Sequence, residues 1–470
     1  MTPNLRVSVP PTATELTAGF ARVRDKLELP QDFPGEVVAQ AESVATRRPG
    51  GEHADETGIE FLTIDPPGSM DLDQAMHIAR RGDGFTVHYA IADPGFFVDD
   101  GSLLDTEAQA RGQTLYSPDL RTPLYPPVLS EGAASLLPDQ TRPSVLWRME
   151  LDAQGVLTGT VVRRAIVRSR TRLTYEEAET DRGGHESVTL LREVGALRQT
   201  IERARGGISL DVPEQEVIAA NGSYHLQYRT PLPIEDCNAQ ISLLTGMAAA
   251  RLMLDAGVGL LRTLPNPDPK SIEALRRTAV ALGVDWPQSQ SYQDFIRTLD
   301  RAKPTHAALL TVSTTLLRGA GYVAFDGTPP EHAEHSAIAA PYAHATAPLR
   351  RLADRYVSEV CVAVCGGVDV PAWVRRTLPE LPAVMSASDR RARSLDRAVL
   401  DYVEAAVLSA HVGSAFDAVV TDVDDDGGIA QIAEPAVRAR VKGKLPLGDT
   451  IRVRLDAADP AAGTVEFAVV

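Results

Sequence analysis

The C-terminal part of the chain limits the possible fold more strongly than any other segment. Between residues 413 and 470, five short runs of alternating apolar and polar residues are separated by Gly, Pro and Asp. The runs cover residues 416–423, 429–432, 438–441, 450–457 and 464–469. Alternation with a period of two is typical of strands that bury one face. Five such strands in so short a segment predict a small OB-type β-barrel.

The remainder of the chain is β-rich at first and helical later. Strand patterns occupy residues 61–64, 85–92, 146–151 and 159–168, whereas residues 14–27 and 34–46 have the period of amphipathic helices. A long helical pattern covers residues 234 to about 262, and the chain stays mostly helical to residue 412. We therefore expect an α+β protein with a short helical segment (1–50), a large mixed domain (51–412) and the barrel (413–470).

Composition and charge exclude several classes of protein. The longest apolar run, residues 241–250, is ended by Arg251, so we expect no membrane span. No signal-peptide pattern is present in residues 1–11, and three cysteines cannot form a disulfide framework, which favours a reducing cytoplasm. A net charge of −16 argues against a protein that coats nucleic acid nonspecifically. It leaves a nucleic-acid enzyme open, because such an enzyme needs positive charge only where phosphates lie.

The sharpest local feature is a cluster of carboxylates at residues 63–73, with the sequence TIDPPGSMDLD. A short strand leads into Asp65, a Pro/Gly turn follows, and Asp71 and Asp73 come two residues apart. Carboxylates this close repel each other unless cations neutralise them. Two divalent ions at such a site would activate a water and stabilise the leaving oxygen in phosphodiester cleavage. A solvated acidic turn is the alternative, because Asp, Gly and Pro are ordinary loop residues.

Short motifs along the chain resemble, in the same order, those of the ribonuclease II (RNB) family of exoribonucleases. Residues 63–73 resemble the aspartate motif of that family, and VHYAIAD at 87–93 resembles the strand that follows it. Other blocks that match are RGQTLY (111–116), PPVLS (126–130), ASLL (134–137), RTRLTY (170–175), IED (234–236) and HATAPLRR (344–351). The resemblance covers residues 55 to about 410. It implies an RNB-type catalytic domain over 51–412, followed by an OB-type RNA-binding barrel over 413–470.

The resemblance also implies an activity: metal-dependent hydrolysis of single-stranded RNA from the 3′ end, releasing nucleoside 5′-monophosphates. Asp65, Asp71 and Asp73 match catalytic, metal-binding aspartates, with Mg²⁺ the expected ion and Mn²⁺ the alternative. The motif of the family ends in two adjacent aspartates, and here the second is Gln74. A neutral amide can ligate only weakly, so we expect weaker metal binding, which a carboxylate at position 74 would strengthen.

Arg350 and Arg351 follow a turn at which a helix should begin. The resemblance places Arg350 on the scissile phosphate, where a guanidinium can grip two oxygens and stabilise developing charge. Arg351 is assigned to substrate binding beside it. The alternative for this basic pair is a solvated helix face on which Asp354 is a salt-bridge partner. A second basic run, at residues 390–397, does not distinguish a channel wall from a solvent face.

Four further positions match substrate-binding residues of the family. Tyr116 corresponds to a tyrosine that stacks on the terminal base, and its apolar partner corresponds to Leu210, which has no aromatic face. Tyr175 and Glu235 correspond to positions that recognise ribose, where a carboxylate can accept from the 2′-hydroxyl. Glu235 capping the helix that begins near it is the alternative. Asp396 aligns loosely with an acidic position near the terminal nucleotide.

The two ends of the chain set the remaining expectations. Many family members carry two cold-shock-type domains before the catalytic domain, and residues 1–50 are too few for one, so we expect a short helical segment instead. The barrel either contacts RNA through its basic residues or serves only as a packing domain. Single-stranded RNA is the expected partner, with a monomer favoured. The alternative function is a weakly active or noncatalytic RNA-binding member of the same fold, reached through Gln74 and Leu210.

Overall fold

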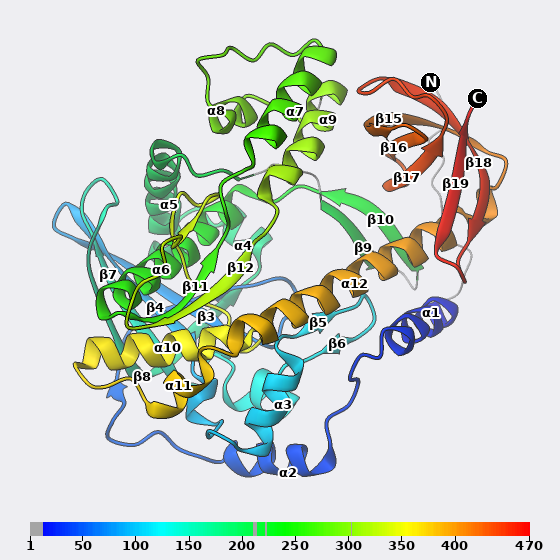
Figure 1. Cartoon of the computed structure of the whole chain (residues 1–470). Helices are drawn as coiled ribbons and strands as arrows, with labels where there is room; N and C mark the ends of the chain where they lie inside the picture. The colour runs from blue at the N-terminus through cyan, green and yellow to red at the C-terminus, as the bar shows by residue number, and fades with distance from the viewer. Residues whose placement is uncertain (1–12, 210–213, 221–222, 302) are drawn as a thin grey trace.

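A computed structural model of the chain describes residues 13–209, 214–220, 223–301 and 303–470 (Figure 1). It contains a mixed α/β body, a helical lobe above it and a small β-barrel at the C-terminal end. The long helix α12 (Leu381–Leu408) runs from the body to the barrel. The α+β class and the C-terminal barrel expected from the sequence are confirmed.

The body is built on a six-stranded sheet with the order β1-β8-β2-β3-β4-β7, in which β7 also pairs with β8. The strands are β1 (Ala54–Asp55), β2 (Phe61–Ile64), β3 (Gln74–Arg81), β4 (Gly84–Ala92), β7 (Thr141–Leu151) and β8 (Leu157–Leu173). Strand β2 is parallel to β8 and antiparallel to β3. Eight of the nine residues of β4 are buried, which explains its nearly continuous apolar sequence, because helices cover the sheet.

The remaining helices belong to the body and to the lobe. They are α2 (Gly35–Val44), α3 (Leu103–Arg111), α4 (Tyr175–Thr180), α5 (Glu186–Arg205), α6 (Pro233–Ala256), α7 (Pro269–Ala281), α8 (Tyr292–Arg297), α9 (Pro304–Ser313), α10 (Leu352–Gly366) and α11 (Ala372–Thr377). The expected helix over 234–262 ends earlier, at Ala256, because Gly257 takes a left-handed conformation with φ of 72°. The next residues form strand β11 (Val258–Thr263), paired with β12 (Gly321–Asp326). The helical prediction was wrong there.

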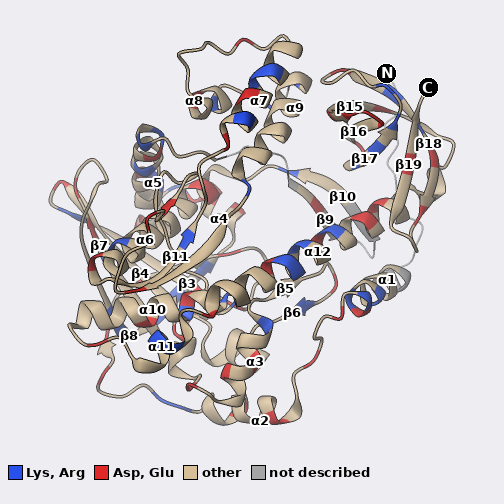
Figure 2. Ribbon diagram, viewed as in Figure 1, with Lys and Arg blue, Asp and Glu red and all other residues tan. Residues whose placement is uncertain are grey.

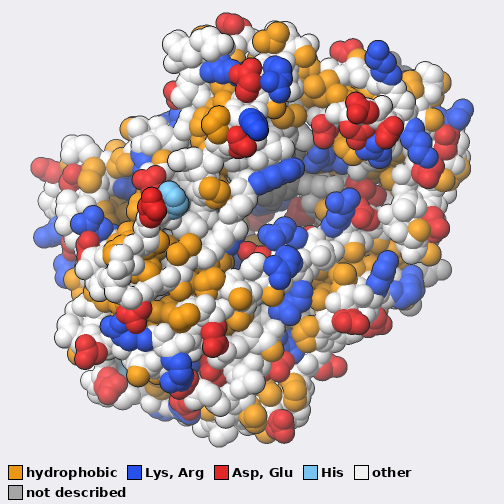
Figure 3. Space-filling model, in the orientation of Figure 1, with side chains coloured by type: hydrophobic (Ala, Val, Ile, Leu, Met, Phe, Trp, Pro, Cys, Tyr) orange, Lys and Arg blue, Asp and Glu red, His pale blue; other side chains and the backbone are white. Residues whose placement is uncertain are grey.

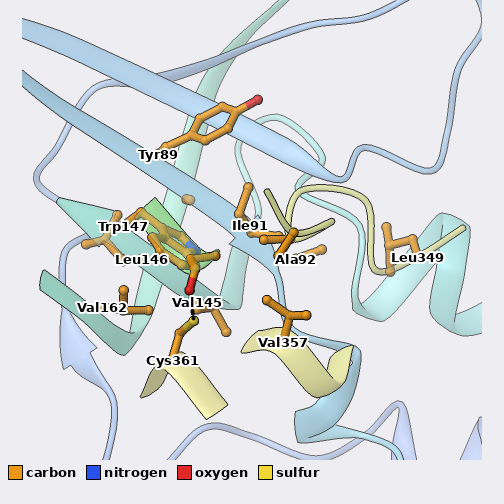
Figure 4. Packing of buried hydrophobic residues seen from close by; sticks show 14 of the residues in the cluster. Tyr89, Ile91, Ala92, Val145, Leu146, Trp147, Val162, Leu349, Val357 and Cys361 are labelled. Atoms are coloured by element: carbon orange, nitrogen blue, oxygen red, sulfur yellow. Dashed lines mark hydrogen bonds between the residues drawn. The ribbon is translucent and has the colours of Figure 1, made fainter. Parts of the chain in front are cut away.

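One hydrophobic core joins the sheet to α6 and α10. Figure 4 shows Trp147 and Val162 from β7 and β8 packed toward Cys361 and Val357 of α10. Trp147 and Cys361 are fully buried, so Cys361 is a core residue, as the apolar sequence around it indicates. None of the helices in the described ranges is long and apolar enough to cross a membrane.

The barrel closes in the order β15-β16-β17-β19-β18. Its strands are β15 (Ala415–Asp424), β16 (Gly427–Ile432), β17 (Val437–Lys442), β18 (Thr450–Asp459) and β19 (Thr464–Val469). These bounds agree with the five sequence runs to within a few residues. Its interior residues form one cluster with α12 and with α1 (Ala13–Lys26), so barrel, linking helix and N-terminal helix share a core.

Candidate active site

The carboxylate segment leaves the sheet at the end of β2 and returns at the start of β3. Gly68 has φ of 81°, a left-handed conformation that the turn requires and that glycine adopts without strain. Ser135 fixes the far side of the turn: its Oγ accepts from the backbone N–H of Leu72 (2.9 Å) and donates to the carbonyl of Met70 (2.7 Å). The turn therefore directs Asp65, Asp71 and Asp73 to one edge of the sheet.

A cavity of about 250 Å³ lies at this edge. Its charged and polar lining residues are Asp65, Ser69, Asp71, Asp73, Gln74, Tyr116, Arg121, Tyr175 and Arg350. The structure thus brings the three aspartates together with Tyr116, Tyr175 and Arg350. It adds Arg121, to which the sequence analysis assigned no role. We call this space the acidic cavity.

Asp73 and Asp65 are carboxylates removed from water. Asp73 is 4% exposed; its Oδ1 accepts from the backbone N–H of Leu349 (2.7 Å), and its Oδ2 lies 3.2 Å from Nε of Arg350. Burial raises the pKa of Asp73 to about 7, although Arg350 and the Leu349 N–H oppose that rise. Burial likewise raises the pKa of Asp65 to about 6, and its buried Oδ2 has no hydrogen-bond partner. Both groups would be stabilised as anions by a divalent cation.

Asp71 has a different environment. Its Oδ1 forms a short ion pair with Nη1 of Arg121, whose Nη2 donates to Oε1 of Glu131 at 2.9 Å. The chain also has no group of three His, Cys, Asp or Glu side chains placed to hold a metal ion, as far as the described residues extend. Asp71 is thus already paired with Arg121, whereas Asp65 and Asp73 are the two buried carboxylates whose ionised form a divalent ion would stabilise.

Both ends of the Gln74 side chain are bound within the protein. Its Nε2 donates to the carbonyl of Thr346 (2.6 Å), and its Oε1 accepts from the hydroxyl of Tyr89 (2.5 Å). The Tyr89 oxygen lies 3.0 Å from Oγ of Ser242 on α6. Gln74 therefore joins the start of β3 to the loop that leads to Arg350.

Further hydrogen bonds hold the loop over residues 346–349. The two arginines that follow this loop have different partners. Asp354 accepts from the backbone N–H of Ala347 (2.8 Å), and also from Nε (2.5 Å) and Nη2 (2.8 Å) of Arg351. The guanidinium of Arg351 is thus held by Asp354 through two bonds, and Arg351 does not line the acidic cavity. This agrees with the salt-bridge alternative for Arg351, although the pair is largely buried and not on a solvated helix face. Arg350 points its half-exposed guanidinium into the cavity.

The two positions assigned to ribose differ in placement. Tyr175 lines the acidic cavity, and Nδ2 of Asn238 lies 3.4 Å from its hydroxyl. Glu235 lies in the first turn of α6, where its Oε1 accepts from the backbone N–H of Leu232 (2.9 Å) and from Arg229 (2.5 Å). The helix-capping alternative for Glu235 has this direct geometric support. Leu210 lies outside the described residues.

A second, larger cavity of about 620 Å³ shares Tyr116 with the acidic cavity. Its walls come from the turn after β5 (Leu115–Tyr116), the hairpin of β9 (Glu214–Ala220) and β10 (Ser223–Arg229), helix α12 and strand β17. Asp396 lies in this cavity with Tyr228 and Arg438, and burial raises the pKa of Asp396. Tyr116, 48% exposed, lines both cavities, so its side chain is part of the wall of each. We call this space the barrel-side cavity.

Positive charge gathers in the same region. Figure 2 shows Lys and Arg along the middle of α12, and Figure 3 shows the molecule hollowed between α12 and the barrel with basic side chains around the hollow. Not every arginine of α12 is available: Nη2 of Arg391 donates to the carbonyls of Ala110 (2.9 Å) and Arg111 (2.7 Å). The basic run on α12 therefore includes an arginine that is bound within the protein as well as arginines at the surface.

Comparison with known families identifies this arrangement. A model of the RNB domain matches residues 54–366. The chain belongs to the RNB family. An RNase II-type exonuclease C-terminal S1 domain matches residues 414–470, which form the barrel. The resemblance noted from the sequence motifs is confirmed.

Similar proteins include ribonuclease R from Aquifex aeolicus and from Escherichia coli, each 26% identical to this chain. The alignments cover 95% and 94% of this RNB protein but 69% and 60% of the two relatives. Among solved structures, ribonuclease R of Mycoplasma genitalium in complex with ribose-methylated single-stranded RNA has a TM-score of 0.88 at 18% identity, covering 97% of this chain and 78% of that one. Yeast Ssd1, a pseudonuclease, has a TM-score of 0.70 at 16% identity, covering 94% and 57%.

Proposed function

We propose that the protein is a 3′-to-5′ exoribonuclease that hydrolyses single-stranded RNA to nucleoside 5′-monophosphates. The observation that carries this proposal is the acidic cavity, where three aspartates, Tyr116 and Arg350 converge in a member of the RNB family. Its small volume, about 250 Å³, suits one nucleotide at the end of a strand better than a duplex. The adjoining barrel-side cavity continues beyond Tyr116 and has room for the preceding nucleotides.

The positions of the residues in the acidic cavity support the roles proposed for them. Arg350 reaches into the cavity with a guanidinium that can donate to two phosphate oxygens and stabilise charge that develops on them. Tyr116 offers a ring on which any base can stack, which suits an enzyme without sequence preference. Tyr175 presents its hydroxyl to the same space, where a 2′-hydroxyl can pair with it. Glu235 would act on the ribose only indirectly, because it caps α6 and binds Arg229.

Asp65 and Asp73 are the residues that would hold a divalent ion, for which we propose Mg²⁺, with Mn²⁺ as a substitute. Such an ion supplies an activated water and neutralises phosphate charge. Asp73 is also positioned by the Leu349 N–H, so that its second oxygen faces Arg350. A cytoplasmic location, Asp396 as a contact to the strand near its end, and a monomeric state remain predictions from the sequence.

The first experiment is an assay of the purified protein on a 5′-labelled single-stranded RNA with Mg²⁺ or Mn²⁺, resolved on a sequencing gel. We expect a ladder that shortens from the 3′ end and nucleoside 5′-monophosphates as products. Asp73→Asn should abolish the ladder while RNA still binds, because grip comes from other residues. Cleavage by Asp73→Asn near the wild-type rate at saturating metal would contradict the site assignment, and internal fragments would contradict the exonuclease.

A weakly active or noncatalytic RNA-binding protein is the second candidate. The observation that favours it is Gln74, whose amide is neutral and engaged on both sides. Likeness to the fold of Ssd1 agrees with it, because that pseudonuclease has the same fold. Tight RNA binding without any cleavage at any metal concentration, for wild type and for Gln74→Asp alike, would select this candidate.

A further inference from the structure

Arg121 enters the acidic cavity from a short hairpin that also carries Tyr116. Strands β5 and β6 (Arg121–Thr122) are antiparallel, and Tyr116 and Arg121 are directly paired across them. The base-stacking ring and this guanidinium are therefore held in fixed register at the cavity wall. Arg121 is 50 residues away from its ion-pair partner Asp71, so no local sequence motif connects the two.

The guanidinium of Arg121 is fixed by two carboxylates. Nη1 pairs with Asp71 and Nη2 donates to Glu131 at 2.9 Å, and the three side chains are 27%, 12% and 29% exposed. A guanidinium has five N–H donors, so these contacts leave others to face the cavity. Partial burial strengthens the attraction, because fewer waters screen it.

The three aspartates of the cavity are therefore not equivalent. Asp71 has its own protein cation, whereas Oδ2 of Asp65 is buried with no hydrogen-bond partner. Gln74 contributes no charge, and both ends of its amide are occupied. Asp73 also has a protein cation, but Arg350 lies 3.2 Å from its Oδ2 and is half-exposed, so it can turn to a phosphate and leave that oxygen to a divalent ion, together with Asp65.

The net charge of the side chains that line the cavity also favours a single divalent ion. Three aspartates and two arginines, Arg121 and Arg350, give a net charge of −1. One divalent cation would change this to +1, opposite to the single negative charge of a phosphodiester. A second divalent cation would give +3, and it would have to displace Arg121 from Asp71 or bind beside it against Coulomb repulsion.

We propose that Arg121 takes the place of a second metal ion in this site. The protein then binds one divalent ion, on Asp65 and Asp73. In a two-metal site, the second ion would bind Asp71, which here pairs with Arg121. This inference rests on the proposed function. In the reaction, a water oxygen bonds to phosphorus as the bond to the 3′ oxygen of the preceding nucleotide breaks. The released 3′ oxygen takes up a proton, and the terminal nucleotide leaves as a 5′-monophosphate that carries the water oxygen on its phosphorus. Arg121 neutralises Asp71, and its remaining N–H groups donate to phosphate oxygens, as does Arg350.

Metal stoichiometry tests this inference without RNA and without activity. The full chain is titrated with Mn²⁺, and free Mn²⁺ is followed by electron paramagnetic resonance. We expect one bound Mn²⁺ for wild type and a second, weaker one for Arg121→Met, which releases Asp71 and Glu131. Arg121→Lys keeps a cation and should keep the count at one. Arg376→Met is the matched control, because Arg376 pairs with Asp100 in an exposed ion pair that does not line the cavity.

Kinetics give the second readout. Arg121→Met should hydrolyse RNA roughly tenfold to a hundredfold more slowly at saturating Mn²⁺, a loss typical of a removed partner of a metal site. Arg121→Lys should recover part of the rate. Two Mn²⁺ of similar affinity on wild type, or one on Arg121→Met with an unchanged rate, would overturn the assignment of Arg121. If the Mn²⁺ counts behave as expected but wild type cleaves no RNA, the exoribonuclease proposal fails and the assignment of Arg121 stands.

Discussion

Asp73 is nearly fully buried beside Arg350, and this environment makes its protonation sensitive to pH in the physiological range. Burial raises its pKa from 3.8 to about 7 in the metal-free protein. Between these values the folded state holds a proton that the unfolded state has released, so stability of the metal-free protein falls as pH rises through this window. A divalent ion bound at Asp73, as proposed, would compete with that proton and reverse the loss.

Thermal unfolding with and without Mn²⁺ measures this competition. The increase in Tm caused by Mn²⁺ should be larger at about pH 8 than at about pH 5.5, because Asp73 must be ionised to bind the ion. Asp73→Asn should show little increase at either pH. An increase of equal size at both pH values in wild type would mean that Asp73 does not titrate with the metal.

Gln74 is the position where the chain departs from the family motif. Restoring the carboxylate there should have two opposed effects. Gln74→Asp adds negative charge, so the Mg²⁺ concentration at half-maximal rate should fall. It also removes the N–H that holds the Thr346 carbonyl, so the plateau rate should fall as the loop before Arg350 loosens. A metal titration of the rate separates the two quantities. Tyr89→Phe, which removes the hydroxyl that lies between Gln74 and Ser242 but changes no charge, should lower the plateau and leave the half-saturation unchanged.

Helix α10 begins two residues after Arg350, so whatever fixes this helix also fixes the guanidinium proposed to bind phosphate. Arg355 anchors it: Nη1 donates to Asp105 (2.5 Å) on α3 and Nη2 to the carbonyl of Val98 (2.7 Å). The side chains of the ion pair are 1% and 2% exposed. Removal of one member would leave a charge buried without its counterion.

Arg355→Met should therefore lower the free energy of unfolding by about 3–5 kcal/mol, measured by urea denaturation. The double variant Arg355→Met/Asp105→Asn is the control, because it buries no unpaired charge. It should lose less than the sum of the two single variants. Additive losses would show that the pair is not coupled.

Elements with a strong periodic pattern could be predicted from the sequence, and those defined by tertiary partners could not. The five barrel strands and β4 alternate or run apolar over several residues, so their positions were predictable. Strand β11 was missed because an apolar run after a long helix reads equally well as more helix. Arg121 had no local signal at all, since its role depends on Asp71 across the cavity. The motif around Asp65 placed the site, but its contacts had to come from the fold.

At the scale of the whole molecule, a net charge of −16 coexists with a basic lining between α12 and the barrel. The basic side chains of β17 show that only part of the positive charge on this strand lines the barrel-side cavity. Arg440 pairs twice with Asp424 at 2.8 Å and Lys442 pairs with Glu466 at 3.3 Å, whereas Arg438 lines the barrel-side cavity. A basic strand therefore presents one arginine to that cavity.

Arg438→Gln should weaken binding of single-stranded RNA and reduce the slope of log K against log salt by about 0.7, the value for one lost phosphate contact. Arg440→Gln is the matched control and should leave both unchanged, because Arg440 already faces Asp424. Binding is measured by fluorescence anisotropy at several salt concentrations on Asp73→Asn, so that the RNA stays intact. Equal effects of both variants would show that the barrel contacts RNA through a different surface.

Helix α1 has a consequence for anyone who shortens this chain. Arg24 forms two bonds to Asp119, at 2.6 and 3.0 Å, in the turn just after Tyr116, and Phe20 packs edge-on against Tyr402 of α12. A fragment that starts at residue 54, where the RNB match begins, would keep every aspartate of the acidic cavity. It would nevertheless lose the contacts of Arg24 with the turn after Tyr116 and uncover apolar side chains of α12 that pack against α1. We therefore expect a working fragment of this protein to include α1 as well as the residues of the RNB match.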